Sequence, residues 1–128
     1  MKAEQRDTFD VKNNYMFIKN ALEGKRLKVR SFNQTYDVEF SIETYYNGRP
    51  AACLYDVIDG APFATLTCNI PEIPLEKDEI IVKVWSENAI LVKPCLASGL
   101  FEDTEKRIPT GFVIAEIWKV KSEQEKED

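Results

Sequence analysis

The sequence contains no histidine, and its three cysteines are dispersed without the C-x-x-C spacing of zinc and redox sites. Histidine is the side chain most used for proton transfer near neutral pH and the commonest metal ligand, so its absence argues against acid–base catalysis and metal binding. Cys53, Cys68 and Cys95 each lie among apolar residues. We therefore expect buried, reduced thiols of a cytosolic protein, with no metal and no cofactor.

Long apolar runs and common nucleotide or nucleophile motifs are also missing. No run approaches the length of a membrane span, and the polar start M-K-A-E-Q-R-D is unlike a signal peptide. The sequence has no P-loop, no G-x-G-x-x-G and no G-x-S-x-G. The net charge of −5 disfavours polymeric nucleic acid as a partner, because such binding requires Lys and Arg to neutralise phosphates. These absences predict a non-enzymatic protein that binds neither membranes nor nucleic acid polymers.

The composition is that of one ordinary globular domain. The 128 residues are 44% hydrophobic and 30% charged, which suits a single core. We expect a loose, polar N-terminus over 1–10 and a folded core over 11–120. The last residues, 121–128, are almost all charged or polar and predict a disordered tail.

Apolar spacing predicts two helices. The first runs over 11–23 and ends at Gly24, because its apolar residues recur at intervals of four, three and four and share one face. These residues are Val11, Tyr15, Ile18 and Leu22. The second runs over 87–98, with Ser86 as a natural N-cap, and Pro94 predicts a kink or two short pieces.

Between and after these helices, apolar and polar residues alternate as in antiparallel strands. Asn47-Gly48 is the strongest hairpin signal, and residues 102–110 are interpreted as a polar loop. The fold class is therefore α+β: an antiparallel sheet of about six strands, an N-terminal helix, and a helix inserted before the last strand. The expected strands are 27–31, 36–43, 50–57, 62–69, 79–85 and 111–120.

Several cations near the start of the sheet are candidates for binding a phosphate. Arg26 and Arg30 belong to a group of four cations within six residues, and Arg30 shares a strand face with Lys28. A guanidinium matches phosphate oxygens bidentately, which favours the arginines over the lysine. A solvated strand face explains the same pattern.

Arg107 precedes I-P-T-G-F, a segment whose backbone is restricted at Pro109 and flexible at Gly111. A constrained loop beside a strand can hold a guanidinium ready for an anion, and Thr110 can add a hydroxyl group. A solvent-facing arginine and a simple turn are the alternatives.

Trp85 and Asn88 flank the start of the second helix. The free N–H groups at a helix start favour anions, and an indole can stack on a purine. Asn88 offers both a donor and an acceptor for a base or a ribose. The alternatives are a packed indole for Trp85 and a capping side chain for Asn88.

Four short segments resemble a family of small phage and mobile-element proteins, and within it the Thoeris anti-defence proteins of type one. The segments are N-G-R-P at 47–50, P-F-A-T-L-T-C-N-I-P at 62–71, W-S-E-N at 85–88 and I-P-T-G-F-V at 108–113. The resemblance implies a protein that sequesters a cyclic ADP-ribose signal in the infected bacterial cytosol without cleaving it. It also implies a homodimer or higher homo-oligomer with pockets between subunits, and a capacity to hold cyclic oligonucleotides.

By this resemblance, Arg107 and either Arg26 or Arg30 would contact the pyrophosphate of the ligand. Trp85 and Asn88 would take the base and the ribose. Whether such a pocket closes within one chain or across a dimer stays open at this point.

Two other functions remain to be weighed. The acidic net charge and the charged tail over 121–128 suit a protein–protein inhibitor of a host defence enzyme. A hydrolase of the signal would change the ligand chemically, and the absence of histidine argues against it.

Overall fold

The computed structural model describes residues 2–122, with residues 2–10 as backbone only. The described chain is α+β, with an N-terminal helix, a second helix before the last strands, and antiparallel sheets, which confirms the predicted fold class. The predicted tail over 121–128 falls mostly outside the described residues. The elements, in order, are α1 (Lys2–Leu22), β1 (Arg26–Ser31), β2 (Gln34–Thr44), β3 (Pro50–Asp56), β4 (Pro62–Thr65), β5 (Glu79–Val82), η1 (Ser86–Asn88), α2 (Ala89–Ala97), β6 (Phe101–Thr110) and β7 (Val113–Val120).

The first helix is longer than the sequence pattern predicts. We expected a loose segment over 1–10, whereas α1 is helical from Lys2. Residues 2–6, K-A-E-Q-R, are strong helix formers, and adding turns to an existing helix costs little compared with starting one. The predicted end is close, since α1 stops at Leu22 and Gly24 takes the positive φ of a helix C-terminus.

Within residues 2–122, seven strands form two sheets, whereas the sequence predicted about six strands in one. The orders are β1-β2-β3-β4 and β5-β7-β6, with every pairing antiparallel. The two sheets meet where the chain just after β4 passes β5, through the bridge Thr67–Val82. Backbone hydrogen bonds of 3.0 Å and 2.9 Å flank that bridge, from Cys68 N to Ile81 O and from Lys83 N to Leu66 O. We call this junction the seam.

The additional strand is β6, which replaces the polar loop predicted over 102–110. Its side chains are mostly exposed, so it lacks the apolar alternation by which a half-buried strand is recognised. It lies at the edge of the three-stranded sheet, where charged side chains and a β-bulge discourage pairing with other chains. The register shifts between Asp103 and Lys106, and Glu105 has a φ of 71°.

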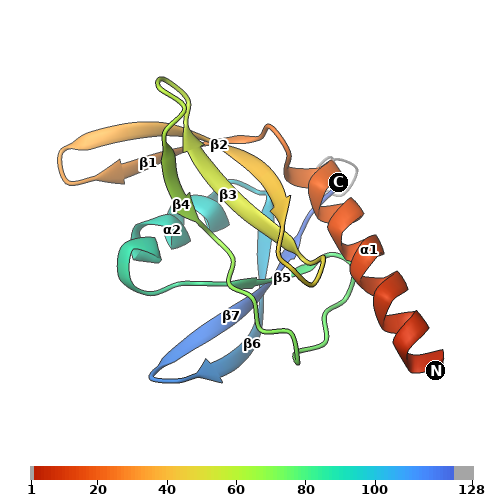
Figure 1. Ribbon diagram of the computed structural model, residues 1–128. Coiled ribbons are helices and arrows are strands. Elements are labelled where there is room, and N and C mark those ends of the chain that lie inside the picture. Colours follow the sequence, from red (N-terminus) through yellow and green to blue (C-terminus); the bar gives the residue numbers. More distant parts are fainter. Residues whose placement is uncertain (1, 123–128) are drawn as a thin grey trace.

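The second helix begins with a 3-10 turn, η1, and continues as α2 with Pro94 inside it. The predicted division into two pieces therefore occurs at Ala89 and not at the proline. In Figure 1, α2 lies between the β1–β2 hairpin and the β6–β7 hairpin, and it contacts both β1 and β6. The helix α1 runs along the opposite side of the molecule.

The main core lies between the two sheets and the helices. Phe101 packs against Phe40 of the larger sheet at 5.9 Å and against Trp118 of the smaller sheet at 5.6 Å, between ring centroids. All three rings are buried. A smaller apolar cluster covers the other face of the three-stranded sheet, around Ile81, Ala115 and Ile117.

Candidate functional site

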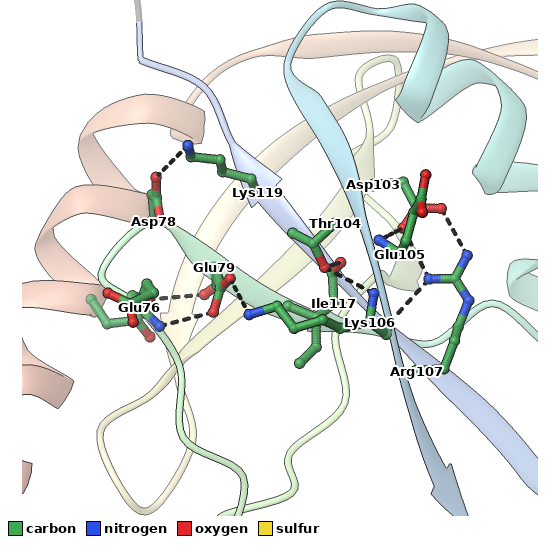
Figure 2. Close-up of polar contacts among 11 residues, drawn as sticks. Glu76, Asp78, Glu79, Asp103, Thr104, Glu105, Lys106, Arg107, Ile117 and Lys119 are labelled. Atoms are coloured by element: carbon green, nitrogen blue, oxygen red, sulfur yellow. Dashed lines mark hydrogen bonds and ion pairs between the residues drawn. The ribbon is translucent and has the colours of Figure 1, made fainter.

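Arg107, the main sequence-predicted anion ligand, is already paired with carboxylates. Its guanidinium donates two parallel hydrogen bonds to Asp103, of 2.9 Å and 2.8 Å (Figure 2). Its Nε lies 3.6 Å from Oε2 of Glu116. The hydrogen bond from Arg107 lowers the pKa of the Asp103 carboxyl, and the same bond raises the pKa of Arg107. An incoming phosphate would have to compete with these two carboxylates.

Trp85 lies on the other face of the three-stranded sheet from Arg107. It packs on the smaller apolar cluster beside Ile117, whereas Arg107 is opposite Glu116, and neighbouring residues of a strand point to opposite faces. Asn88 is 0% exposed, and its amide donates to the carbonyls of Thr65 and Lys83 at 2.7 Å and 3.1 Å. The structure therefore does not bring Trp85, Asn88 and Arg107 to one pocket of a single chain.

Two of the three cations of β1, Arg26 and Lys28, form salt bridges across an exposed strand face. Arg26 pairs with Glu39 at 2.9 Å, and Arg30 donates a long bond of 3.4 Å to the hydroxyl of Thr35. This arrangement corresponds to the solvated-face alternative. Thr110 is half-buried at the end of β6, opposite Val113, in the β6–β7 turn.

A groove of about 830 Å³ lies beside the start of β5, and Figure 2 draws several of its charged residues. Lys106 crosses to Glu79 with a 2.8 Å ion pair, and Lys119 lies 3.7 Å from Asp78. The Glu79 carboxylate is only 7% exposed and also accepts the backbone N–H of Glu76 at 2.9 Å. We call this hollow the lysine groove. Its lining residues are Asn13, Pro74, Leu75, Glu76, Lys77, Asp78, Glu79, Glu102, Thr104, Lys106 and Lys119.

Sequence reasoning did not find the lysine groove, because its walls come from four distant segments. The charges of Lys106 and Glu79 are 27 positions apart and meet only after β6 and β5 have both paired with β7. Four carboxylates and three ammonium groups line the groove, so cationic and anionic groups lie side by side. Such a surface can accept hydroxyl donors and bind anions at the same time.

A second hollow, of about 440 Å³, lies between α1, the β2–β3 turn and the loop after the seam. The guanidinium of Arg49 donates through Nη1 to the carbonyl of Ile70 at 2.9 Å and through Nη2 to the carbonyl of Ile73. Burial lowers the pKa of Arg49, and no ion pair within residues 11–122 involves it. We call this the Arg49 hollow. It is lined by Val11, Asn14, Asn47, Arg49, Pro71, Glu72, Ile73, Pro74 and Leu75.

Two buried asparagines hold the ends of β5, and one of them, Asn14, lines the Arg49 hollow. Asn14 of α1 is 3% exposed and donates from Nδ2 to the carbonyls of Lys77 and Glu79, at 2.8 Å and 3.0 Å. Asn88 holds the opposite end of the strand through Lys83. In each, the side-chain oxygen is buried and has no hydrogen-bond partner within the described residues. The only sequence signal for Asn14 was a polar residue on the apolar face of the helix, three residues after Val11 and four before Ile18.

The three cysteines are poor nucleophiles. Burial raises the pKa of Cys95 to about 12, and it also raises the pKa of Cys53 and Cys68, so that little thiolate forms near neutral pH. Within residues 2–122, no cluster of three or more potential metal ligands occurs. No helix in that same range is long and apolar enough to cross a bilayer. Because their pKa values are raised, the three thiols are not activated as nucleophiles.

Comparison with models of known families, with curated proteins and with solved structures finds no match for this chain.

Proposed function

We propose that this protein is a non-catalytic anti-defence protein that binds and sequesters a signalling nucleotide of the cyclic ADP-ribose type. By holding the signal in the cytosol of an infected bacterium, it would keep the signal from the Thoeris effector. The observation that carries the proposal is the lysine groove, in which ammonium groups and carboxylates line one hollow of about 830 Å³. The resemblance of the short sequence segments supplies the identity of the signal.

The groove contains the groups that a ribose-phosphate ligand needs. The pyrophosphate would accept hydrogen bonds from Lys106 and Lys119, in competition with Glu79 and Asp78, the carboxylates with which these lysines are paired. Ribose hydroxyls are commonly bound by carboxylates, here those of Glu76 or Glu102. Pro74 offers an apolar contact for a base. The volume falls within the range of about 300–1,000 Å³ that is usual for small-molecule sites.

Holding without conversion is supported by the chemistry of the thiols. The buried Cys95 has a strongly raised pKa, and a nucleophile needs the thiolate form. The mechanism is therefore stoichiometric, and it depends on affinity and slow release. Both are properties of the bound state and require no change in the ligand.

We extend the proposal to a homo-oligomer. The outer edge of β6 has no strand partner within the described chain, and the groove residues Glu102, Thr104 and Lys106 lie along that strand. Because the charged, bulged edge of β6 discourages strand pairing, a second copy would pack over the face of this strand, enclose the groove and remove it further from water. This arrangement would place the pocket between subunits.

Titration calorimetry with cyclic ADP-ribose isomers tests the proposed site. We expect Lys106→Gln to weaken binding about tenfold, which corresponds to about 1.4 kcal/mol. The matched control is Lys28→Gln, which removes an exposed, ion-paired lysine far from the groove. Arg107→Ala tests the sequence-based prediction, and a larger loss for Arg107→Ala than for Lys106→Gln would reject the groove as the site.

The fate of the ligand tests the non-catalytic part of the proposal. The protein is incubated with the filtrate of an activated TIR-domain enzyme, the source of the proposed signal. It is then denatured, and the small molecules that it releases are identified by mass spectrometry. Intact nucleotide supports sequestration, and fragments would show an enzyme.

A protein–protein inhibitor is the second candidate, and the hairpin tips favour it. Phe32 in the β1–β2 turn is 97% exposed, and Phe112 in the β6–β7 turn is fully exposed. Aromatic side chains are enriched in protein interfaces. If this function holds, Phe112→Ser abolishes inhibition of the host defence enzyme without changing nucleotide affinity, and deletion of residues 121–128 weakens partner binding.

A further inference from the structure

We propose that the Arg49 hollow is a second binding site, which takes a small organic monoanion: a carboxylate joined to an apolar group and to a hydrogen-bond donor. The site is independent of the nucleotide proposal. It adjoins the lysine groove only through Pro74 and Leu75, and none of the lysines of the groove lines it.

The anion requirement follows from Arg49. Two of the five N–H groups of its guanidinium donate to loop carbonyls, of Ile70 and Ile73, which fixes the plane of the group. The nearest carboxylate influence comes from Glu72, which does not approach within ion-pair distance in the described chain. A half-buried cation without a counter-ion is costly, and a bound carboxylate would lower that cost.

The donor requirement follows from Asn14, which also lines the hollow. Its Nδ2 is used by the backbone carbonyls before β5, which fixes the orientation of the amide. The Oδ1 is then left as a buried acceptor without a partner. The oxygen has almost no exposed surface, so a ligand N–H group would satisfy it after a small movement of the wall; an amide next to a carboxylate has such a group.

The remaining walls select against polyanions. Most of those described are apolar, and among residues 11–122 the one acidic group of the lining, Glu72, is exposed. That carboxylate would repel a second negative charge of a pyrophosphate, whereas a single carboxylate can be placed on Arg49 alone. The apolar side chains are Val11, Pro71, Ile73, Pro74 and Leu75. A volume of about 440 Å³ suits a ligand of the size of an acylated apolar amino acid.

The test is an NMR titration of the ¹⁵N-labelled full chain with three probes. N-acetyl-leucine carries the carboxylate, the amide N–H and the apolar group, leucinamide lacks the carboxylate, and inorganic phosphate lacks the apolar group. We expect N-acetyl-leucine to shift the backbone signals of Gly48 and Arg49 and the side-chain amide of Asn14, and to bind at least tenfold more tightly than either other probe. Equal or tighter binding of leucinamide or phosphate, or no shift at millimolar N-acetyl-leucine, overturns the proposal.

Substitutions test whether N-acetyl-leucine binds in the Arg49 hollow. Arg49→Gln should weaken N-acetyl-leucine at least tenfold, and Arg49→Lys should weaken it less because the charge is kept. Because Arg49 also holds loop carbonyls, Val11→Trp is a second variant that fills the hollow and leaves the guanidinium in place. Lys106→Gln and Arg107→Gln are controls outside the hollow and should leave affinity unchanged. Unchanged affinity in both Arg49→Gln and Val11→Trp would exclude this site, even if nucleotide binding at the lysine groove is intact.

Discussion

Asn88 connects three backbone segments through one buried amide. Its Nδ2 joins the end of β4 at Thr65 to the end of β5 at Lys83, and its own backbone lies at the start of α2. Because the side chain is fully buried, water cannot replace the amide without rearrangement. Its contribution is therefore to the stability of the fold.

We expect Asn88→Ala to lower the free energy of unfolding by about 1–3 kcal/mol, because two carbonyls lose their donor in a buried site. Urea denaturation measures the change. The control is Asn20→Ala on the exposed face of α1, which should alter stability by less than about 0.5 kcal/mol. A loss at Asn88 no larger than that of the control contradicts the structural role.

Strand β6 carries its charges in a local arrangement that depends on its bulge. In a regular strand, residues four apart are separated by about 13 Å. The bulge between Asp103 and Lys106 shifts the register, and Arg107 and Asp103 then form two hydrogen bonds. Strand β6 therefore carries an ion pair between two of its own residues, on its exposed side.

The ion pair gives stability a dependence on pH at the acid end. The folded-state pKa of Asp103 is lowered, so its contribution is present above the ordinary carboxyl pKa of about 3.9 and is lost as the pH falls through the lowered value. We expect Asp103→Asn to cost about 0.3–1 kcal/mol at pH 7 and progressively less below pH 4. Denaturation at several pH values measures it, with Glu102→Gln as the exposed neighbouring control. A cost that is independent of pH would contradict this assignment.

The prediction for Arg107 shows which features of strand β6 could be predicted from the sequence and which could not. The residue types suited anion binding, and the position before a Pro and a Gly suggested a preorganised loop. Nothing in the linear pattern showed that residues 102–110 would pair with β7, or that a bulge would bring Asp103 to the guanidinium. The role of Arg107 in ligand binding stays a prediction, and its carboxylate partners make it a weaker one.

At the scale of the whole molecule, Trp118 belongs to the core between the two sheets, next to Phe101, which packs in turn on Phe40 of the larger sheet. Its indole is fully buried, packs on Phe101, and donates from Nε1 to Glu116 at 2.9 Å. Folded domains are stable by only about 5–15 kcal/mol, so one such residue is a large part of the total.

Trp118→Ala should lower the free energy of unfolding by about 3–5 kcal/mol, because a large cavity opens in the core. Phe112→Ala is the matched control, since it removes an aromatic ring that is fully exposed, and we expect almost no change. Chemical denaturation followed by circular dichroism compares the two. Similar losses in both variants are incompatible with a core centred on Trp118.

The α+β class, the first helix and the antiparallel pairing were predictable, because periodicity is a local property of the sequence. The division into two sheets was not, because it depends on where the chain leaves one ladder and enters another. The place where the two sheets join is the bridge between Thr67 and Val82, two residues that are 15 positions apart in the sequence. The two hollows escaped prediction for the same reason.

The segment between the two sides of the seam connects ligand binding with the stability of the fold. Residues 69–78 connect the two sides of the seam, and they also provide walls for both the lysine groove and the Arg49 hollow. A ligand in either hollow would thus hold together the connection on which the assembly of the sheets depends. By mass action, a ligand at a hundred times its dissociation constant adds about 2.7 kcal/mol to the folded state. The melting temperature of the whole chain is therefore a direct assay for occupancy of both hollows, and libraries of small molecules can be screened against the protein without knowledge of its natural ligand.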